Sequence, residues 1–303
     1  MWETVELREL RIFLTLADEL HFARTAERLH ISQSRVSQAV RTLETRVGGA
    51  LFERTSRRVA LTPLGQQMRS EVAPAYERLR QAYEHTRERV TGIAGTLRIG
   101  LYTPLSAGPH MVDIVAEFTS RHPGCKAEFV NTGLNEDPLS WVRTGRVDLL
   151  AIRLPIDQAD IAIGPVLSRE ERVLLVSRND PLAKQAEIDY EDIGDRPVSD
   201  IPTFPREMMD AYIPPVTGSG RRLRRTVSHT TDEAMMRVAV GEQVHPTVPS
   251  WLDHHNHPDV VAVPIRDLPP SETALAWVAA VQSPRVRAFV TVARDVLAKT
   301  GDV

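Results

Sequence analysis

The chain has 303 residues, of which 42% are hydrophobic and 25% charged, and this balance predicts a globular protein of about two domains rather than a disordered one. No run of about 18 apolar residues is present and residues 1–20 lack the apolar core of a signal peptide, which argues against a membrane partner and for a cytoplasmic protein. The net charge of −3 and the single cysteine, Cys125, exclude a wholly basic chain and an internal disulfide.

The first 47 residues have the pattern of three short helices. Apolar residues recur at three- and four-residue steps over residues 7–17 and again over residues 22–29. Ser32 or Ser34 can cap a third helix that runs to about Val47, where two glycines follow. The second and third helices, joined by a tight turn, predict a helix-turn-helix that places its later helix in the major groove of DNA.

Two short extended runs follow the third helix. Residues 51–54 and 58–61 flank the polar segment Thr55-Ser56-Arg57, which is the pattern of a β-wing. Arginines in such a wing can reach the phosphate backbone or the minor groove, so the wing is expected to add DNA contacts.

The third helix opens with side chains suited to reading bases. Gln33 and Gln38 can pair with adenine, and Arg35 can pair with guanine. The alternative is a solvated polar helix face, but helix, turn, helix and basic wing in series favour DNA binding. The candidate DNA contacts are Arg24, Thr25, Gln33, Ser34, Arg35, Ser37, Gln38 and Arg41 on the helices and Arg54, Ser56, Arg57 and Arg58 in the wing.

One long helix is predicted over residues 63–92. Thr62 is a suitable N-cap, and Pro63 fits the first helical position, where a missing N–H does no harm. A lone helix of this length cannot bury its apolar stripe, so we expect it to pair with a second copy of the chain. The alternative is a helix packed on its own domain. The stripe, in near-heptad steps, is Leu64, Met68, Val72, Ala75, Leu79, Ala82 or Tyr83, Thr86 and Val90.

Strands and helices alternate through residues 93–303. This alternation predicts an α/β domain with mostly parallel sheets. Two apolar runs, residues 172–177 and 260–265, lie where the chain would cross from one lobe to another and return. The other expected strands are 96–102, 126–130, 147–152 and 273–281, and the expected helices are 111–118, 139–143 and 284–297.

Several runs of this sequence resemble the LysR-type transcriptional regulators. The resemblance implies that the helix-turn-helix lies near Phe22–Arg41, with Gln33, Ser34, Ser37 and Arg54 at positions that the family uses on DNA. The family often has arginine where this chain has Gln38. The runs are Glu6–Phe13, Phe22–Leu29, Ile31–Glu44, Gly49–Arg54 and Val59–Gly65 and, more weakly, Gly145–Ile152 and Ser283–Phe289.

The resemblance also implies the architecture of the whole chain. The expected fold class is α/β, with an N-terminal winged helix-turn-helix, a long linker helix and a C-terminal effector domain of two lobes like a periplasmic solute-binding protein. A dimer of dimers is implied as the assembly. The expected boundaries are 5–62 for the winged helix-turn-helix, 63–92 for the linker helix, and 93–303 for the effector domain, with lobe I at 93–165 and 267–303 and lobe II at 166–266.

A ligand cleft is expected at the carboxyl ends of the strands, where helix starts favour anions. In residues 240–246, where the family usually has a glycine-rich turn, this chain has Gln243 and His245. Helix caps and turns are the alternative role for these residue types. The candidate effector contacts are Thr103, Leu105, Ser106, Thr132, Gly133, Ile201, Pro202, Thr203, His229 and His245, and their neighbours Asp200, Phe204, Thr230 and Thr231 are further candidates from the second lobe.

A histidine cluster and an arginine cluster each have two possible interpretations. His254, His255 and His257 have metal-ligand chemistry, but a solvated loop is favoured, and no metal or cofactor is expected. The arginine-rich residues 221–225 form either a solvated charge run, which is favoured, or a site for an anionic effector or protein partner.

The sequence therefore predicts a transcriptional regulator controlled by a small-molecule effector. Its expected partners are a two-fold double-stranded DNA site, the effector, further copies of itself, and RNA polymerase if it activates transcription. A solute-binding protein would fit residues 96–303 alone. An enzyme is opposed because neither a Gly-x-Ser-x-Gly elbow nor a phosphate-binding loop occurs.

Overall fold

A computed structural model describes residues 5–54, 59–91, 93–280 and 283–301 of the chain. It divides into two compact units, an N-terminal unit of residues 1–84 and a C-terminal unit of residues 85–303. None of the helices in the described part of the chain combines the length and apolar character that crossing a membrane requires.

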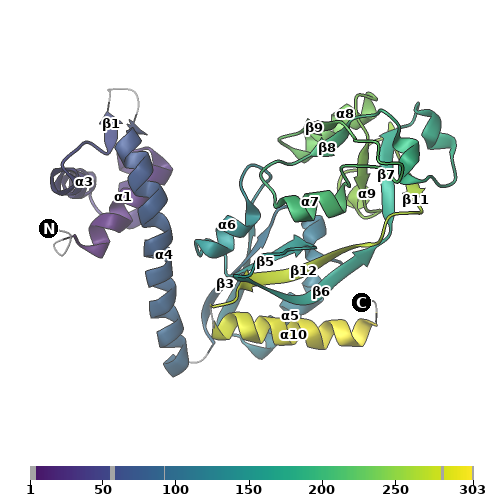
Figure 1. Cartoon of the computed structure of the whole chain (residues 1–303). Coiled ribbons are helices and arrows are strands. Elements are labelled where there is room, and N and C mark those ends of the chain that lie inside the picture. Colours follow the sequence, from purple (N-terminus) through teal and green to yellow (C-terminus); the bar gives the residue numbers. More distant parts are fainter. Residues whose placement is uncertain (1–4, 55–58, 92, 281–282, 302–303) are drawn as a thin grey trace. The chain divides into compact units, whose positions relative to one another are not determined.

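Three helices build the N-terminal unit, namely α1 (Leu7–Glu19), α2 (Phe22–Leu29) and α3 (Gln33–Val47) (Figure 1). The predicted cap is confirmed, because the Ser32 hydroxyl accepts a hydrogen bond from the Arg35 amide at 3.3 Å. The helix ends at Gly48, whose φ of 85° is a left-handed conformation that glycine adopts without strain.

A hairpin follows α3 and packs against it. Its strands β1 (Phe52–Arg54) and β2 (Val59–Leu61) pair antiparallel. The Glu44 carboxylate on α3 accepts hydrogen bonds from the amides of Leu51 and Phe52, at 3.0 and 3.2 Å. The Phe52 ring then meets Phe13 edge-on, with centroids 5.6 Å apart, so the wing is anchored to the helical core.

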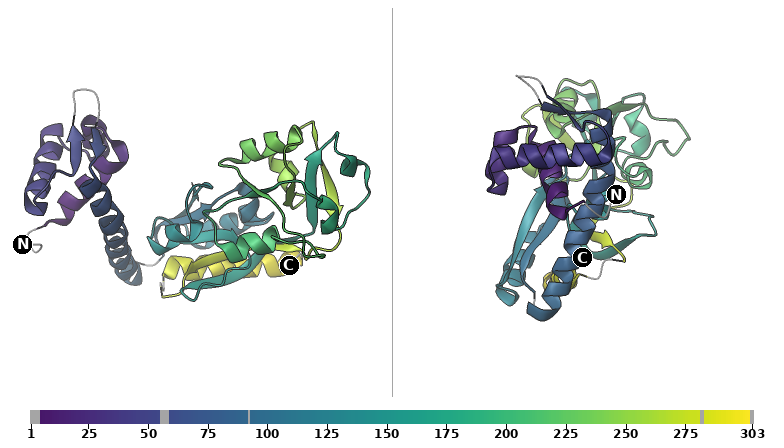
Figure 2. Two further views of the ribbon diagram at one scale, coloured as in Figure 1. Left: turned by 45° about the horizontal axis from the view of Figure 1, so that its top comes forward. Right: turned by 90° about the vertical axis from the view of Figure 1, so that its left-hand side faces the viewer.

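The long helix α4 (Pro63–Thr91) begins where the sequence predicts. The Thr62 hydroxyl accepts from the Gly65 amide at 2.9 Å, and Pro63 occupies the first helical position. Figure 2 shows α1, α2 and α3 gathered around the first turns of α4. Met68 packs on the core of this unit, whereas Leu79 is half exposed and Tyr83 is 73% exposed.

The C-terminal unit consists of two lobes, defined here by their sheets. Lobe I has a five-stranded sheet in the order β4-β3-β5-β12-β6. Figure 1 shows α5 (Met111–Arg121) and α10 (Pro284–Thr300) along one face of it, where Phe118 and Phe289 pack edge-on in the core. The strands are β3 (Gly95–Leu101), β4 (Cys125–Asn131), β5 (Leu149–Arg153), β6 (Ile161–Glu170) and β12 (Ser271–Val278).

Lobe II has a three-stranded sheet in the order β10-β7-β11 and a small pair, β8-β9. The two apolar runs predicted to lie where the chain crosses between the lobes form β7 and β11 of lobe II, which pair with each other antiparallel. The strands are β7 (Arg172–Ser177), β8 (Val198–Asp200), β9 (Arg225–Val227), β10 (His245–Thr247) and β11 (Val260–Ile265). The remaining helical segments are η2 (Pro104–Ala107), α6 (Pro138–Arg143), η3 (Pro181–Lys184), η4 (Tyr190–Ile193), α7 (Arg206–Tyr212), α8 (Thr231–Ala239) and α9 (Trp251–His254).

The expectation of mostly parallel sheets is wrong. Strands β3, β4 and β5 are parallel, as βαβ crossovers through α5 and α6 require, but β12 pairs antiparallel with both β5 and β6. The cause is the double crossing, since β12 enters lobe I from lobe II and runs opposite to β5. Strand β6 stays paired with β12 up to Glu170, beyond the lobe boundary expected at residue 165.

Candidate DNA-binding face and ligand cavity

Helix α3 separates its side chains into a buried face and a polar face. Val36, Val40 and Leu43 are buried in the core of the N-terminal unit. The predicted reading residues face solvent, apart from Ser37, which is half-buried. The exposed ones are Gln33, Ser34, Arg35, Gln38 and Arg41. A helix that follows a tight turn and presents amides, hydroxyls and guanidiniums together has the chemistry for contacting base edges.

The two candidates on α2 differ from each other. Arg24 is exposed, and its guanidinium contacts Glu19, donating to the carbonyl oxygen at 2.6 Å. Thr25 is fully buried, and its hydroxyl donates to the His21 carbonyl oxygen at 2.9 Å. The expectation that Thr25 contacts DNA is therefore corrected, because its side chain is used inside the helix-turn-helix.

The wing candidates lie at the edge of what the structure describes. The backbone of Arg54 belongs to β1, while Ser56, Arg57 and Arg58 fall in residues 55–58, outside the described residues.

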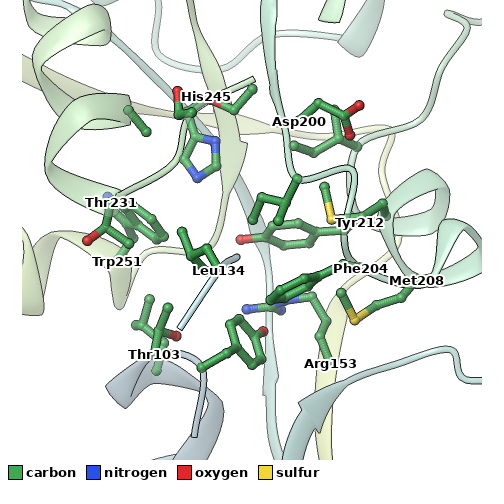
Figure 3. Close-up of a pocket in the computed structure, with 18 of the residues that line it drawn as sticks. Thr103, Leu134, Arg153, Asp200, Phe204, Met208, Tyr212, Thr231, His245 and Trp251 are labelled. Atoms are coloured by element: carbon green, nitrogen blue, oxygen red, sulfur yellow. The ribbon is translucent and has the colours of Figure 1, made fainter. Parts of the chain in front are cut away.

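A cavity lies between the two lobes of the C-terminal unit, where strands end (Figure 3). The parallel strands β3 and β5 deliver Tyr102, Thr103 and Arg153 from lobe I, as expected for carboxyl ends of neighbouring strands. Lobe II adds residues after β8 and β9, from α7 and from the starts of α8, β10 and α9. Counted with its open mouth, the space between the atoms here is about 630 Å³.

The walls of this cavity are mainly apolar and aromatic. Phe204 meets Tyr102 edge-on, with ring centroids 5.1 Å apart. Figure 3 shows Trp251 and Leu134 on one side of the space and Tyr212, Phe204 and Met208 on the other. Such walls favour a ligand with an apolar body.

Arg153 brings a buried positive charge to this apolar space. The residue is 3% exposed, its guanidinium lies 4.1 Å from the centroid of the Tyr212 ring, and it donates to the Ser271 hydroxyl. Within the described residues no carboxylate forms an ion pair with it. The negative charge of Glu170 acts on Arg153 without an ion-pair contact. The Glu170 oxygens accept hydrogen bonds from the amide and the hydroxyl of Ser250 instead.

A second buried arginine lies on the same tyrosine. The Arg172 guanidinium is 4.6 Å from the centroid of the Tyr212 ring and donates to the backbone oxygens of Tyr212 and Thr247. Burial, and then the like charge of Arg153, lower the pKa of Arg172. Two guanidiniums, that of Arg153 in the cavity wall and that of Arg172 outside the lining, therefore lie on the one Tyr212 ring.

His245 occupies the cavity as a neutral imidazole. Burial lowers its pKa to about 3, and the charges of Arg172 and Arg153 act in the same direction. Its ring lies 4.7 Å from Trp251, and Figure 3 shows it directed into the space. Among the described residues neither of its ring nitrogens has a hydrogen-bond partner, nor do the Trp251 indole N–H and the Ser228 hydroxyl.

The acidic residue of the cavity, Asp200, is already neutralised. Its carboxylate accepts from Arg206 at 3.0 Å and from Arg225 at 3.1 Å. Arg225 in turn is held by Asp210 at 2.8 Å. Asp200 thus belongs to a network that fixes α7 against β8 and β9, and little of its charge is left for a ligand.

The structure brings together only part of the predicted effector set. Thr103, Leu105, Ile201 and His245 line the cavity. Ser106 does not, because it is fully buried and its hydroxyl donates to the Thr103 carbonyl oxygen at 2.7 Å. The expected anion site at the start of η2 is therefore corrected, since this segment has only four residues and its serine is used internally.

The other expected contacts lie outside the cavity lining. The Thr203 hydroxyl donates to the Leu134 carbonyl oxygen at 2.7 Å, and Pro202 and His229 are exposed. Thr132 and Gly133 follow β4 but are not lining residues either. These residues differ in their surroundings, since the Thr203 hydroxyl bonds a residue far along the chain and the Thr132 hydroxyl has no partner among the described residues. A turn position after a strand therefore does not by itself place a side chain in the cavity wall.

Sequence reasoning missed the residues that give the cavity its character. Arg153 carried a usable signal, because a charged residue ends the otherwise apolar strand 149–153. Tyr212 and Trp251 come from short helices far along the chain, and nothing in their local sequence distinguishes them from core aromatics. The residues missed are Tyr102, Leu134, Arg153, Ser199, Met208, Met209, Tyr212, Ile213, Ser228, Ala234 and Trp251.

The histidine and arginine clusters have structural surroundings. His255 stacks on Trp251 at 4.6 Å, and the His257 ring accepts from the Asp259 amide at 3.1 Å. No group of three potential metal ligands occurs in the described part of the chain. In the arginine run, Arg221 binds the Glu191 carboxylate at 2.7 Å and Arg225 binds Asp200 and Asp210.

Two family models match this chain over separate ranges. One, described as "Bacterial regulatory helix-turn-helix protein, lysR family", matches residues 7–66. The other, described as "LysR substrate binding domain", matches residues 91–298. The first contains α1 to α3 and the wing, and the second contains both lobes around the cavity.

Similar proteins include two named transcriptional regulators. The chain is 30% identical over 200 residues to the HTH-type transcriptional regulator ShiR of Corynebacterium glutamicum (strain R), covering 66% of this chain and 67% of ShiR. It is 31% identical over 198 residues to the HTH-type transcriptional regulator TtuA of Agrobacterium vitis, covering 64% of this chain and 63% of TtuA. The chain thus spans about two thirds of the length of these relatives.

Solved structures resemble the chain over nearly its full length. A single-substitution variant of full-length OxyR from Pseudomonas aeruginosa has 26% identity and a TM-score of 0.62, covering 96% of this chain and 94% of that one. Full-length CbnR complexed with its target DNA has 18% identity and a TM-score of 0.66, covering 96% and 99%. At 18% identity, the likeness to CbnR shows the fold alone.

Proposed function

Because the chain belongs to the LysR family of transcriptional regulators, we propose that it binds double-stranded DNA through α3 and alters transcription when a small molecule occupies the cavity. The observation that carries the proposal is the exposed polar face of α3, the helix after the turn, on which Gln33, Arg35 and Gln38 are all exposed. Ser34, Ser37 and Arg41 complete the face. Arg24 on α2 is proposed as a further DNA contact, and the wing arginines are proposed to hold the phosphate backbone.

A second copy of the chain is the proposed partner of α4. Leu64, Leu79 and Tyr83 are 38%, 50% and 73% exposed, at positions of the near-heptad stripe. Pairing two such helices removes this apolar surface from water and sets two α3 helices on one DNA duplex. The operator is then a two-fold site, and a dimer of dimers is the proposed full assembly.

The cavity is the proposed site of control. A ligand changes a regulator only through different affinities for two arrangements of it. Here the lining comes from both lobes, so a ligand that contacts Thr103 on one side and His245 on the other changes how the lobes close. Contact with RNA polymerase, should the protein activate transcription, stays a prediction.

The proposed place and kind of action follow from DNA binding. The protein works in the cytoplasm and as a regulator rather than an enzyme. The cavity supports this, because its imidazole has no nucleophile or carboxylate bonded to it among the described residues.

Footprinting tests the proposal on the DNA upstream of the protein's own gene. The full chain is expected to protect a two-fold sequence whose half-sites lie about 10 base pairs, or a multiple, apart. Arg35→Ala together with Gln38→Ala is expected to abolish protection, while Ser70→Glu on α4, off the apolar stripe, leaves it unchanged. Equal protection by wild type and the double variant would remove α3 as the reading element.

A further inference from the structure

The Arg153 guanidinium in the cavity wall is in ion-pair contact with no carboxylate in the described part of the protein, and the charge of Glu170 acts on it only without contact. A guanidinium carries five N–H donors. Those of Arg153 meet the Ser271 hydroxyl, the Tyr102 hydroxyl and the face of Tyr212, and none of these groups is a carboxylate. Burial raises the pKa of Tyr102, which keeps its hydroxyl neutral. A buried cation without an anionic partner is costly, so this position favours an incoming anion.

Arg172 strengthens that preference. Its guanidinium lies on the same Tyr212 ring as Arg153, and Tyr190, Tyr212 and Arg153 are the groups that act on its charge. Within the described residues it too forms no ion pair with a carboxylate. Two like charges on one aromatic ring repel each other, and an anion near Arg153 relieves the repulsion.

The opposite side of the cavity is polar but neutral. His245 presents one donor nitrogen and one acceptor nitrogen, and both lack partners among the described residues. The Ser228 hydroxyl and the Trp251 indole N–H, also without partners there, line the same space. Unpaired buried groups of this kind fit a ligand group that both donates and accepts, such as a hydroxyl.

We propose that the cavity takes a small carboxylic acid with an apolar body, its carboxylate on Arg153 and a hydroxyl or carbonyl group near His245. This inference rests on the proposed effector role of the cavity and adds the chemical class of the effector. The apolar body lies between Trp251 and Phe204, which Figure 3 shows on facing sides of the space.

A cationic ligand is the competing possibility, since Asp200 also lines the cavity. Its carboxylate is held by both Arg206 and Arg225, at 3.0 and 3.1 Å. The carboxylate of Asp200 is therefore paired with two guanidiniums, whereas the guanidinium of Arg153 is paired with no carboxylate in the described part of the chain. The balance of charge selects an acid over an amine.

Matched probes of one skeleton test the class directly. The full chain is titrated by calorimetry with phenylacetate and 4-hydroxyphenylacetate, with phenylacetamide as the neutral analogue and with phenethylamine as the cationic one. The acids are expected to bind at least about tenfold more tightly than the amide and the amine, because only they pair with a buried guanidinium. The hydroxyl-bearing acid is expected to bind more tightly than phenylacetate, because it meets His245.

Two variants assign the preference to named residues. Arg153→Gln keeps a hydrogen-bonding side chain but deletes the charge, and it is expected to abolish the preference for acid over amide. Arg178→Gln is the matched control, since that arginine is exposed on the surface beside Asp259. His245→Phe is expected to remove the gain from the hydroxyl and to retain the preference for acids. Because each readout is a ratio between ligands on one protein, a general loss of stability does not mimic it.

The outcomes separate this inference from the proposed function. Binding of the amide or amine as tightly as the acids, or no binding of either acid, overturns the assignment of a carboxylic acid. In parallel, anisotropy of labelled operator DNA follows the regulatory response. Acids that bind in the predicted order but leave DNA binding and footprint unchanged contradict effector control, not the ligand class.

Discussion

The imidazole of His245 lies inside the C-terminal unit, where burial and the guanidiniums of Arg172 and Arg153 lower its pKa to about 3. In the unfolded chain a histidine titrates near pH 6.5. Between these pH values the histidine is protonated in the unfolded state but not in the folded state. The contribution of His245 to the free energy of unfolding is therefore fully present above about pH 6.5 and is lost as the pH falls toward 3.

A pH series of unfolding checks this linkage. From pH 7 to pH 5 the free energy of unfolding of the wild type should fall by about 1–2 kcal/mol more than that of His245→Gln. Urea unfolding followed by the tryptophan fluorescence of the C-terminal unit measures the difference. His254→Gln, in an exposed position of α9, should keep the wild-type slope. Identical slopes for all three proteins would show that His245 is accessible to protons.

Arg35 is the second residue on which a single substitution is informative. If it reads a base, Arg35→Ala should cost about 1–3 kcal/mol of DNA binding and relax the preference at one position of the site. The control is Arg69→Ala, since the Arg69 guanidinium is bound to Asp18 at 2.8 Å, away from α3. Anisotropy with a set of single-base operator variants measures both effects. A uniform loss across all variants would make Arg35 a phosphate contact instead.

At the scale of elements, the clearest prediction is that α4 pairs with a second copy of the chain, because its apolar stripe includes Leu79, which is half exposed in the single chain. Leu79→Glu should place a charge in the helix pair and shift the assembly toward monomers. Sedimentation across a micromolar concentration series measures the shift. Ser70→Glu adds the same charge off the stripe and should leave the dimer intact. A monomeric wild type under these conditions would contradict the pairing of α4.

Elements with local signals were predictable from the sequence. The cap at Ser32 and the proline start at Pro63 depend on neighbouring residues only, and both appear as expected. The same holds for α5, α6 and α10, whose apolar spacing is set within each helix. Strand direction was not predictable in this way, since whether β12 runs parallel or antiparallel to β5 depends on the route of the chain through lobe II.

At the scale of the whole molecule, the position of the cavity was predictable from the sequence but its chemistry was not. Its position at the carboxyl ends of β3 and β5 follows from the α/β alternation. Its chemistry depends on Arg153, Tyr212 and Trp251, which are far apart in the chain and meet only after the two lobes close. Turn residues such as Ser106 were expected to bind ligand because they are polar, yet they complete the backbone of their own turns.

DNA recognition by the full chain is the central property assigned to this protein, and selection of bound sequences from a random pool of duplexes tests it most directly. After successive rounds, the wild type should enrich one two-fold sequence with half-sites about 10 base pairs, or a multiple, apart. The variant with Arg35→Ala and Gln38→Ala should enrich none. No enrichment by the wild type, or the same sequence selected by both proteins, would contradict the assignment of this chain as a regulator that reads DNA through α3.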